Sequence, residues 1–182
     1  MIPRPEPVPA PFVSGKINLA LRINVTESAM LSSVSMQVSD LNISSNCGNE
    51  LNALDLNRFD SLQSIEIGDD CFGSVQSFQI DGLNRLKTIK IGNNSFTQNK
   101  QENWKSDIWH IAIKKSDNKL KSFHILNCES LESIQIDKYS FNDFAGQFEL
   151  RNLPNLVFLT ANSYNFYFGS FVIRGIYTTI LK

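Results

Sequence analysis

The sequence has no excess of charge of either sign, with 17 Lys and Arg residues against 18 Asp and Glu residues. The basic residues form no stripe, so a nucleic-acid partner held through its phosphates is disfavoured. No apolar run approaches the roughly 20 residues that a membrane-spanning helix needs, and we expect no membrane span. The N-terminus lacks the apolar core of a signal peptide. This indicates a cytoplasmic protein, or an extracellular one if the chain is a fragment of a surface protein.

The motifs of common catalytic and metal sites are also absent. The sequence contains no CxxC, HExxH or GxSxG motif and no phosphate-binding loop, and these are the arrangements that nucleophiles, zinc ions and nucleotides require. The sequence therefore predicts no catalytic residue, no metal site and no cofactor, and we expect the chain not to be an enzyme.

Proline is concentrated at the start of the chain, where it occupies every second position from Pro3 to Pro11. Each proline ring fixes φ and removes a backbone donor. Residues 1–15 are therefore predicted to form an extended, Pro-rich leader that acts as a spacer.

An aliphatic position recurs along the rest of the chain with a nearly constant period; it holds Leu41, Ile65, Ile89, Ile111, Ile134 and Leu159. Similar residues surround each occurrence, as in the segment from Leu83 to Phe96, which reads LxxLxxIxIGxxSF. The period is about 24 residues, within the range of roughly 20 to 29 residues that is typical of a solenoid. We therefore predict a solenoid of about six repeats over residues 41–182.

Each repeat contains apolar residues spaced two apart, which places both side chains on one face of a strand. The front pairs are Leu41/Ile43, Ile65/Ile67, Ile89/Ile91, Ile111/Ile113, Ile134/Ile136 and Leu159/Ala161, and the back pairs are Leu54/Leu56, Phe78/Ile80, Phe123/Ile125, Phe148/Leu150 and Phe171/Ile173. The predicted fold is therefore mainly β, with two parallel sheets, a shared apolar interior and little or no helix.

Further features refine this prediction. Phenylalanines seven positions after the first front residue are expected to fill the turn between the sheets; they are Phe72, Phe96, Phe141 and Phe166. Ile17 precedes Leu41 by one period. Residues 16–40 are therefore predicted to be a degenerate first repeat or cap, as terminal repeats are often atypical.

The segment LxxLxxIxIGxxSF resembles the leucine-rich repeat, LxxLxxLxLxxNxL, over about residues 38–176. Aromatic residues in the back pairs make it similar to the surface-protein variants of microbial eukaryotes and bacteria. The asparagine of the family pattern is replaced in some repeats, for example by Asp70 and Tyr139. The resemblance implies a curved solenoid that binds proteins or other large ligands, and it implies no enzymatic activity.

The outward residues of the front strands are the predicted binding surface. Glu66 and Lys90 are expected on adjacent strands, where their charges form a ladder pair, and Gln135 follows on a later strand. Trp109, His110 and Phe158 are the exposed aromatic candidates, since such side chains are enriched at binding hot spots. His124 is expected on the back sheet, on the opposite surface from His110.

Cys47 and Cys71 lie one period apart and occupy the same position in successive repeats. The column continues with small polar residues such as Ser95 and Ser140. Two alternatives stay open: a Cys47–Cys71 disulfide in an oxidising compartment, or two thiols standing in for serine.

The sequence thus predicts a non-catalytic recognition module for a protein partner, used in binding or adhesion. One alternative is a structural spacer of a larger surface or scaffold protein, whose C-terminal edge continues in a longer array. The other is a β-helix enzyme that acts on polysaccharides, which would need clustered carboxylates. On the front strands these are only Asp40, Glu66 and Asp137, in distant repeats.

Overall fold

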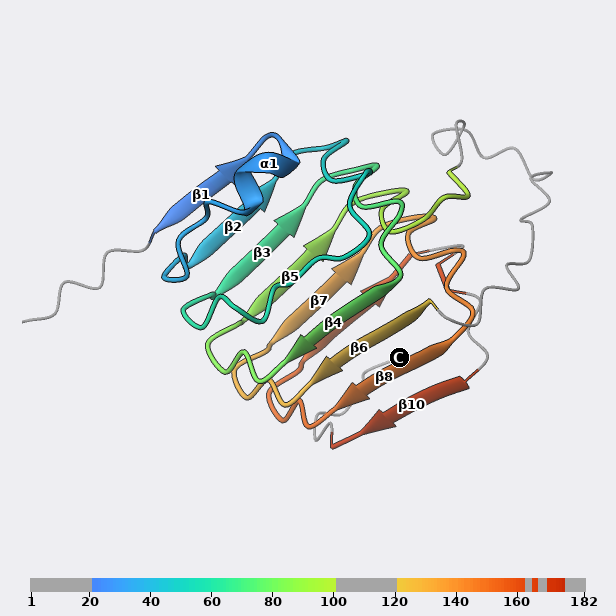
Figure 1. Ribbon diagram of the computed structural model, residues 1–182. Coiled ribbons are helices and arrows are strands. Elements are labelled where there is room, and N and C mark those ends of the chain that lie inside the picture. The colour runs from blue at the N-terminus through green and yellow to red at the C-terminus, as the bar shows by residue number, and fades with distance from the viewer. Residues whose placement is uncertain (1–20, 101–120, 163–164, 167–169, 176–182) are drawn as a thin grey trace, which may run out of the picture.

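The computed structural model describes residues 21–100, 121–162, 165–166 and 170–175, which form two layers of parallel β-strands (Figure 1). The one α-helix in these residues is α1 (Ser28–Leu31). The prediction of a mainly β protein with two parallel sheets and almost no helix is confirmed. The part of the chain that the structure describes contains no helix with the length and apolar composition of a membrane span.

The six-stranded sheet, called the front sheet here, has the order β1-β2-β3-β5-β7-β9. Its strands are β1 (Arg22–Val25), β2 (Asp40–Ile43), β3 (Ser64–Ile67), β5 (Thr88–Ile91), β7 (Ser133–Ile136) and β9 (Phe158–Ala161). From β2 to β7 every strand of this sheet alternates a buried aliphatic residue with a more exposed polar one. This period of two is what a strand with one face in the core requires.

The four-stranded sheet, called the back sheet, has the order β10-β8-β6-β4. Its strands are β4 (Ser77–Asp81), β6 (Ser122–Leu126), β8 (Gln147–Arg151) and β10 (Ser170–Arg174). From β3 onward the described chain alternates between the sheets, so the back strands β4, β6 and β8 are followed by the front strands β5, β7 and β9 (Figure 1).

The interior is filled by like residues stacked on like. In the front sheet Leu41 pairs with Ile65, Ile65 with Ile89, and Ile89 with Ile134. Two phenylalanine columns accompany this aliphatic ladder. In the predicted turn column the Phe96 and Phe141 ring centroids are 4.7 Å apart and the rings are nearly parallel. On the back strands the Phe78 and Phe123 centroids are 5.1 Å apart. Stacked aromatic pairs contribute beyond their buried area.

The turn column requires an unusual backbone. Phe72, Phe96, Phe141 and Phe166 all have φ between 56° and 58°, a left-handed conformation that bulky residues rarely adopt. Gly48 holds the equivalent position one repeat earlier, with φ 74°. A Cβ on Gly48 would lie 2.2 Å from the Phe72 ring. Glycine at this position therefore allows the Phe72 ring to pack directly against the backbone of Gly48.

The aliphatic ladder differs from the prediction in the middle of the chain. Ile89 on β5 pairs directly with Ile134 on β7, so the predicted position of Ile111 and Ile113 between these strands is wrong. Both isoleucines belong to residues 101–120, which lie outside the described residues. Because β5 and β7 are direct neighbours, one step of the ladder spans about two periods of the sequence pattern at this point.

Two further details correct the expected strands. At the N-terminal end Ile23 pairs with Leu41, so the register that placed Ile17 one repeat before Leu41 is wrong. The predicted back pair Leu54/Leu56 forms no strand, and the back sheet begins at β4. Leu56 is nevertheless buried. The apolar pattern thus identified a core residue but not its backbone conformation.

Candidate binding surface

The outward side of the front sheet, called the front face here, carries two rows of side chains that follow from the strand register. One row runs through Asn24, Asn42, Glu66, Lys90, Gln135 and Thr160. The other runs through Arg22, Asp40, Ser64, Thr88, Ser133 and Phe158. Adjacent strands are about 4.8 Å apart, so each row is a regular array along the sheet.

Glu66 and Lys90 form the ion pair that their spacing predicted. Lys90 Nζ lies 2.6 Å from Glu66 Oε1, with both side chains about half exposed. The hydrogen bond to Glu66 and its charge raise the pKa of Lys90. Exposed pairs of this kind contribute little to stability. Their effect here is to hold two long side chains against the sheet.

Other polar side chains of the front face are also paired with one another. Ser64 Oγ donates to Asp40 Oδ1 at 3.1 Å across β2 and β3. Gln135 Nε2 and Asn162 Nδ2 both donate to Asp137 Oδ1, at 3.2 and 2.9 Å. The three front carboxylates thus lie in separate clusters, each with its own partner.

Phe158 is a large, exposed apolar side chain of the front face. It begins β9 and is 66% exposed, and the preceding Val157 is 54% exposed. Exposed apolar residues scattered singly are ordinary, but two consecutive ones at the end of a polar sheet form a local apolar spot. Trp109 and His110, the other predicted aromatic residues of this surface, lie outside the described residues.

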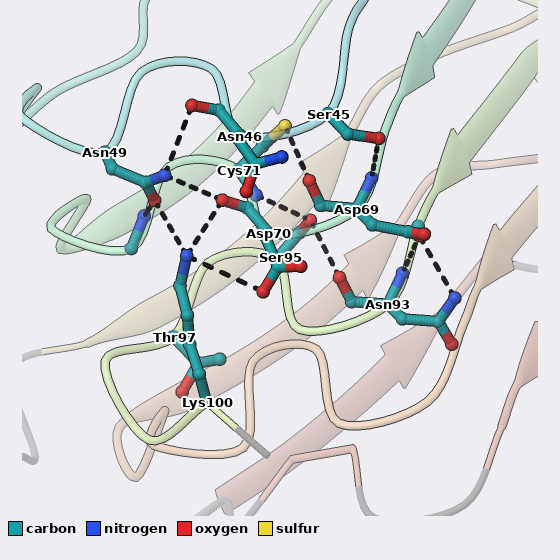
Figure 2. A network of polar contacts seen from close by, with 12 residues as sticks. Ser45, Asn46, Asn49, Asp69, Asp70, Cys71, Asn93, Ser95, Thr97 and Lys100 are labelled. Atoms are coloured by element: carbon teal, nitrogen blue, oxygen red, sulfur yellow. Dashed lines mark hydrogen bonds and ion pairs between the residues drawn. The ribbon is translucent and has the colours of Figure 1, made fainter. Parts of the chain in front are cut away.

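The turn that follows the front strands, called the corner network here, is tied across successive repeats (Figure 2). Asp69 N–H donates to Ser45 Oγ at 3.0 Å, and Asn93 N–H donates to Asp69 Oδ1 at 2.7 Å. Lys100 Nζ donates to the Asp70 carbonyl at 3.0 Å. Each bond joins one repeat to another, so the front strands end on a common, ordered edge.

Glycine brings the repeats together at this edge. A Cβ on Gly68 would lie 2.6 Å from the Ser45 backbone nitrogen, and one on Gly92 would lie 2.7 Å from the Gly68 carbonyl carbon. Both distances are too short for any side chain. The recurrent IxIG of the sequence therefore reflects the close approach of successive repeats.

Cys47 and Cys71 occupy the predicted column as free, buried thiols. Ser95 Oγ donates to the Gly68 carbonyl at 2.8 Å, and Cys71 Sγ donates in the same way to the Ser44 carbonyl at 3.2 Å. Cys71 thus makes the hydrogen bond that serine makes one repeat later. This geometry fits the interpretation of the thiols as serine replacements, and the Cys47–Cys71 disulfide stays a prediction for an oxidising compartment.

The buried thiols predict how the free energy of unfolding depends on pH in the alkaline range. Burial raises the pKa of Cys71 and of Cys128 from 9.0 to about 11. Well below pH 9 both thiols are protonated in folded and unfolded chains alike. Between pH 9 and 11 the unfolded chain loses these protons first, so we expect stability to fall by about 1 to 2 kcal/mol per thiol. Urea denaturation across this pH range measures the loss.

The matched control is the Cys71→Ser/Cys128→Ser variant. Serine suits the first position because Ser95 and Ser140 already occupy the column. At the second position a hydroxyl can replace the Cys128 Sγ donor to the Leu126 carbonyl. We expect this variant to lose less stability than the wild type between pH 9 and 11. Identical pH profiles would contradict the assignment to the thiols.

His124 lies on β6 and projects from the back sheet, as predicted. Its Nδ1 is 3.5 Å from Glu149 Oε2, and Glu149 Oε1 is 3.2 Å from Arg151 Nε. Within residues 21–100, 121–162, 165–166 and 170–175, no group of three or more His, Cys, Asp or Glu side chains could hold a metal ion.

Sequence reasoning missed a polar ladder at the turn after the back strands. Asn127 Nδ2 donates to Asp81 Oδ1, and Asn152 Nδ2 donates to Asn127 Oδ1, each at 2.7 Å. Asn127 and Asn152 both have positive φ. The signal was present in the sequence, because the two asparagines lie about one period apart and each follows a predicted back pair by two positions.

Comparisons of the chain with protein-family models, with curated proteins and with solved structures gave no match.

Proposed function

We propose that the chain is a leucine-rich-repeat-like solenoid that acts as a non-catalytic recognition module and binds a protein partner through the front face. The observation that carries the proposal is Phe158, a 66% exposed aromatic residue on a sheet face that is otherwise polar. Aromatic residues that become buried on binding dominate the affinity of many protein interfaces.

The order of the front face supports the same proposal. Ion pairs and side-chain hydrogen bonds already fix Glu66, Lys90 and Gln135, and the corner network ties the strand ends together. A surface that is ordered before binding loses little side-chain entropy when a partner docks. A pre-ordered front face is therefore expected to bind a partner more tightly than a surface that must rearrange on binding.

The test is a comparison of Phe158→Ala with Thr160→Ala, two residues of the same strand and face. Partners captured by the wild-type chain would be purified and their affinities measured. If Phe158 is a hot spot, Phe158→Ala should weaken binding by about 2 kcal/mol or more, roughly 30-fold, and Thr160→Ala should change it little. Unchanged capture by a folded Phe158→Ala variant would contradict the proposal.

A second candidate function is that of a spacer in a longer array, which one observation favours. Side chains of the last described layer are less buried than their equivalents: Ile173 is 38% exposed, whereas Ile80, Ile125 and Leu150 are 0% exposed. An edge layer of this kind favours stacking of a further strand. In this case we expect self-association in sedimentation experiments that Ile173→Lys abolishes, whereas a monomer at all concentrations would count against it.

A further inference from the structure

β4 is an edge strand of the back sheet, and some of its backbone N–H and C=O groups face a groove without a hydrogen-bond partner. The Gln76 carbonyl accepts from Ser122 N–H, and Gly82 N–H donates to the Leu126 carbonyl, each at 3.1 Å. These two residues therefore turn their backbone groups toward β6. Because backbone groups alternate sides along a strand, Ser77, Gln79 and Asp81 turn theirs to the opposite side, toward the sheet edge.

The hydrogen bond of Asp81 supports this direction independently. Asp81 N–H donates to Asn57 Oδ1 at 2.9 Å, and Asn57 belongs to the segment 52–57 that runs beside β4. This segment is not a strand, and no backbone hydrogen bond between described residues joins it to β4. The Asn57 side chain thus forms a hydrogen bond with the last residue of β4. A neighbouring strand would instead form backbone hydrogen bonds along the whole of β4.

A groove of about 320 Å³ lies between this segment and β4. Asn57 and residues 52–55 form one wall, and Gln76, Ser77 and Gln79 form the other. The N–H and C=O groups of Ser77 and Gln79 have no hydrogen-bond partner among the described residues. They are two residues apart, which is the spacing that an added strand matches.

We propose that this groove binds an extended peptide segment of a partner protein, which adds to β4 as a further strand of the back sheet. Strand addition at an open edge is a recurrent mode of peptide recognition, in which the main chain supplies affinity and the side chains supply specificity. The proposal does not rest on the function of the front face, because the two surfaces belong to different sheets.

The lining of the groove indicates the chemistry of the peptide. Ala53 and Leu54 supply its apolar part, and the limited volume beside them suits small inward side chains. Asp55 is the charged residue of the lining; its Oδ1 accepts the Asn57 N–H at 3.1 Å, and no cation pairs with it among the described residues. The groove therefore selects a strand that alternates small residues with lysine or arginine.

The protein offers a matched pair of variants for the test. Gln79→Pro removes one edge N–H but no bond of the β4–β6 ladder, because proline is tolerated on an edge strand whose N–H faces away from its neighbour. Gln79→Ala removes the side chain and keeps the N–H. The probe is a capped hexapeptide of alternating alanine and lysine, and the readouts are the amide shifts and hydrogen exchange of Ser77 and Gln79 by NMR.

We expect saturable shifts with the wild type and with Gln79→Ala, and at least about tenfold weaker binding to Gln79→Pro. The Ser77 amide should exchange rapidly in the free protein and become protected by the peptide. Equal binding to Gln79→Pro, shifts that do not saturate, or protection of the Ser77 and Gln79 amides in the free wild type would overturn the proposal.

Two variant peptides keep the test decisive even if Gln79→Pro does not fold. N-methylation of every backbone amide of the peptide removes its donors without any change in the protein, and it should abolish binding whichever way the added strand runs. Replacement of lysine by glutamate should also weaken binding at least about tenfold, because Asp55 then faces a like charge. Undiminished binding of the N-methylated peptide would exclude strand addition, and undiminished binding of the glutamate peptide would exclude the selection by Asp55.

Discussion

Ile89→Asp is expected to unfold the protein or to lower its free energy of unfolding by more than about 4 kcal/mol. Ile89 is 1% exposed on β5, the strand that pairs with both β3 and β7. Burial of an isoleucine side chain contributes about 1.5 to 3 kcal/mol. The substitution removes this contribution and also buries a carboxylate without a partner, which costs more than the lost apolar contact.

The effect should be large because the layers support one another. Ile89 lies between Ile65 and Ile134 in the front ladder. The few apolar side chains that one repeat buries cannot by themselves offset the conformational entropy lost when that repeat is ordered. Each repeat therefore depends on its neighbours, and a break in the middle separates the layers on either side.

The control is Thr88→Asp, which introduces the same charge on the outward side of the same strand. Thr88 is exposed on β5, so its replacement should change stability by no more than about 0.5 kcal/mol. Circular dichroism and urea denaturation of both variants measure the difference. Similar stability of Ile89→Asp and Thr88→Asp would contradict the buried ladder.

The sequence was sufficient to predict the ladder because the feature is local and repeated. A pair of aliphatic residues spaced two apart identifies the buried face of a strand, and its recurrence once per period indicates which strands are neighbours. Leu41, Ile65 and Ile89 need no long-range information, since they are aligned in the sequence as they are in the structure. The phenylalanine columns were predicted for the same reason.

Strand pairing in the middle of the chain could not be predicted in this way. Ile111 and Ile113 match the front pattern, yet Ile89 pairs with Ile134. A two-residue pattern reports that a segment could present one apolar face, but it does not report which strand lies beside it. Register is decided by the pairing of whole strands. A match to the pattern is therefore not sufficient to place a segment in the ladder.

The candidate surface was predicted in part. The Glu66–Lys90 pair followed from the repeat period, and the exposure of Phe158 followed from its outward position in the pattern. The open edge of β4 did not, because Leu54 and Leu56 have the spacing of a back strand. Their segment contributes Leu56 to the core without forming a strand. Only the structure shows that the backbone of Ser77 and Gln79 lacks a neighbouring strand there.

The buried pair of Lys121 and Asp143 also has no signal in the sequence, and we expect Asp143→Ala to cost about 3 to 5 kcal/mol. Lys121 Nζ lies 2.8 Å from Asp143 Oδ2, and the two side chains are 1% and 7% exposed. The same carboxylate oxygen accepts the Gln98 N–H at 3.1 Å. One aspartate thus holds two residues, Gln98 and Lys121, that lie between β5 and β6 in the chain.

Removal of either partner should destabilise for the same reason, because the remaining charge stays buried without compensation. Lys121 Nζ also lies 5.3 Å from the centroid of the Phe144 ring, a contact too weak to replace a carboxylate. Asp143→Asn retains an acceptor for Gln98 N–H but leaves the ammonium unpaired. We therefore expect its cost to approach that of Asp143→Ala.

The double variant Lys121→Met/Asp143→Leu distinguishes two contributions to stability. One is the cost of leaving a single buried charge unpaired, and the other is the net stabilisation by the ion pair itself. Two apolar residues of similar size leave no unpaired charge, so the double variant should lose less stability than the sum of Lys121→Met and Asp143→Leu. Urea denaturation of the four proteins gives the coupling energy. Additive losses would show that the two side chains act independently, whereas a double variant as stable as the wild type would mean that the ion pair adds no net stability.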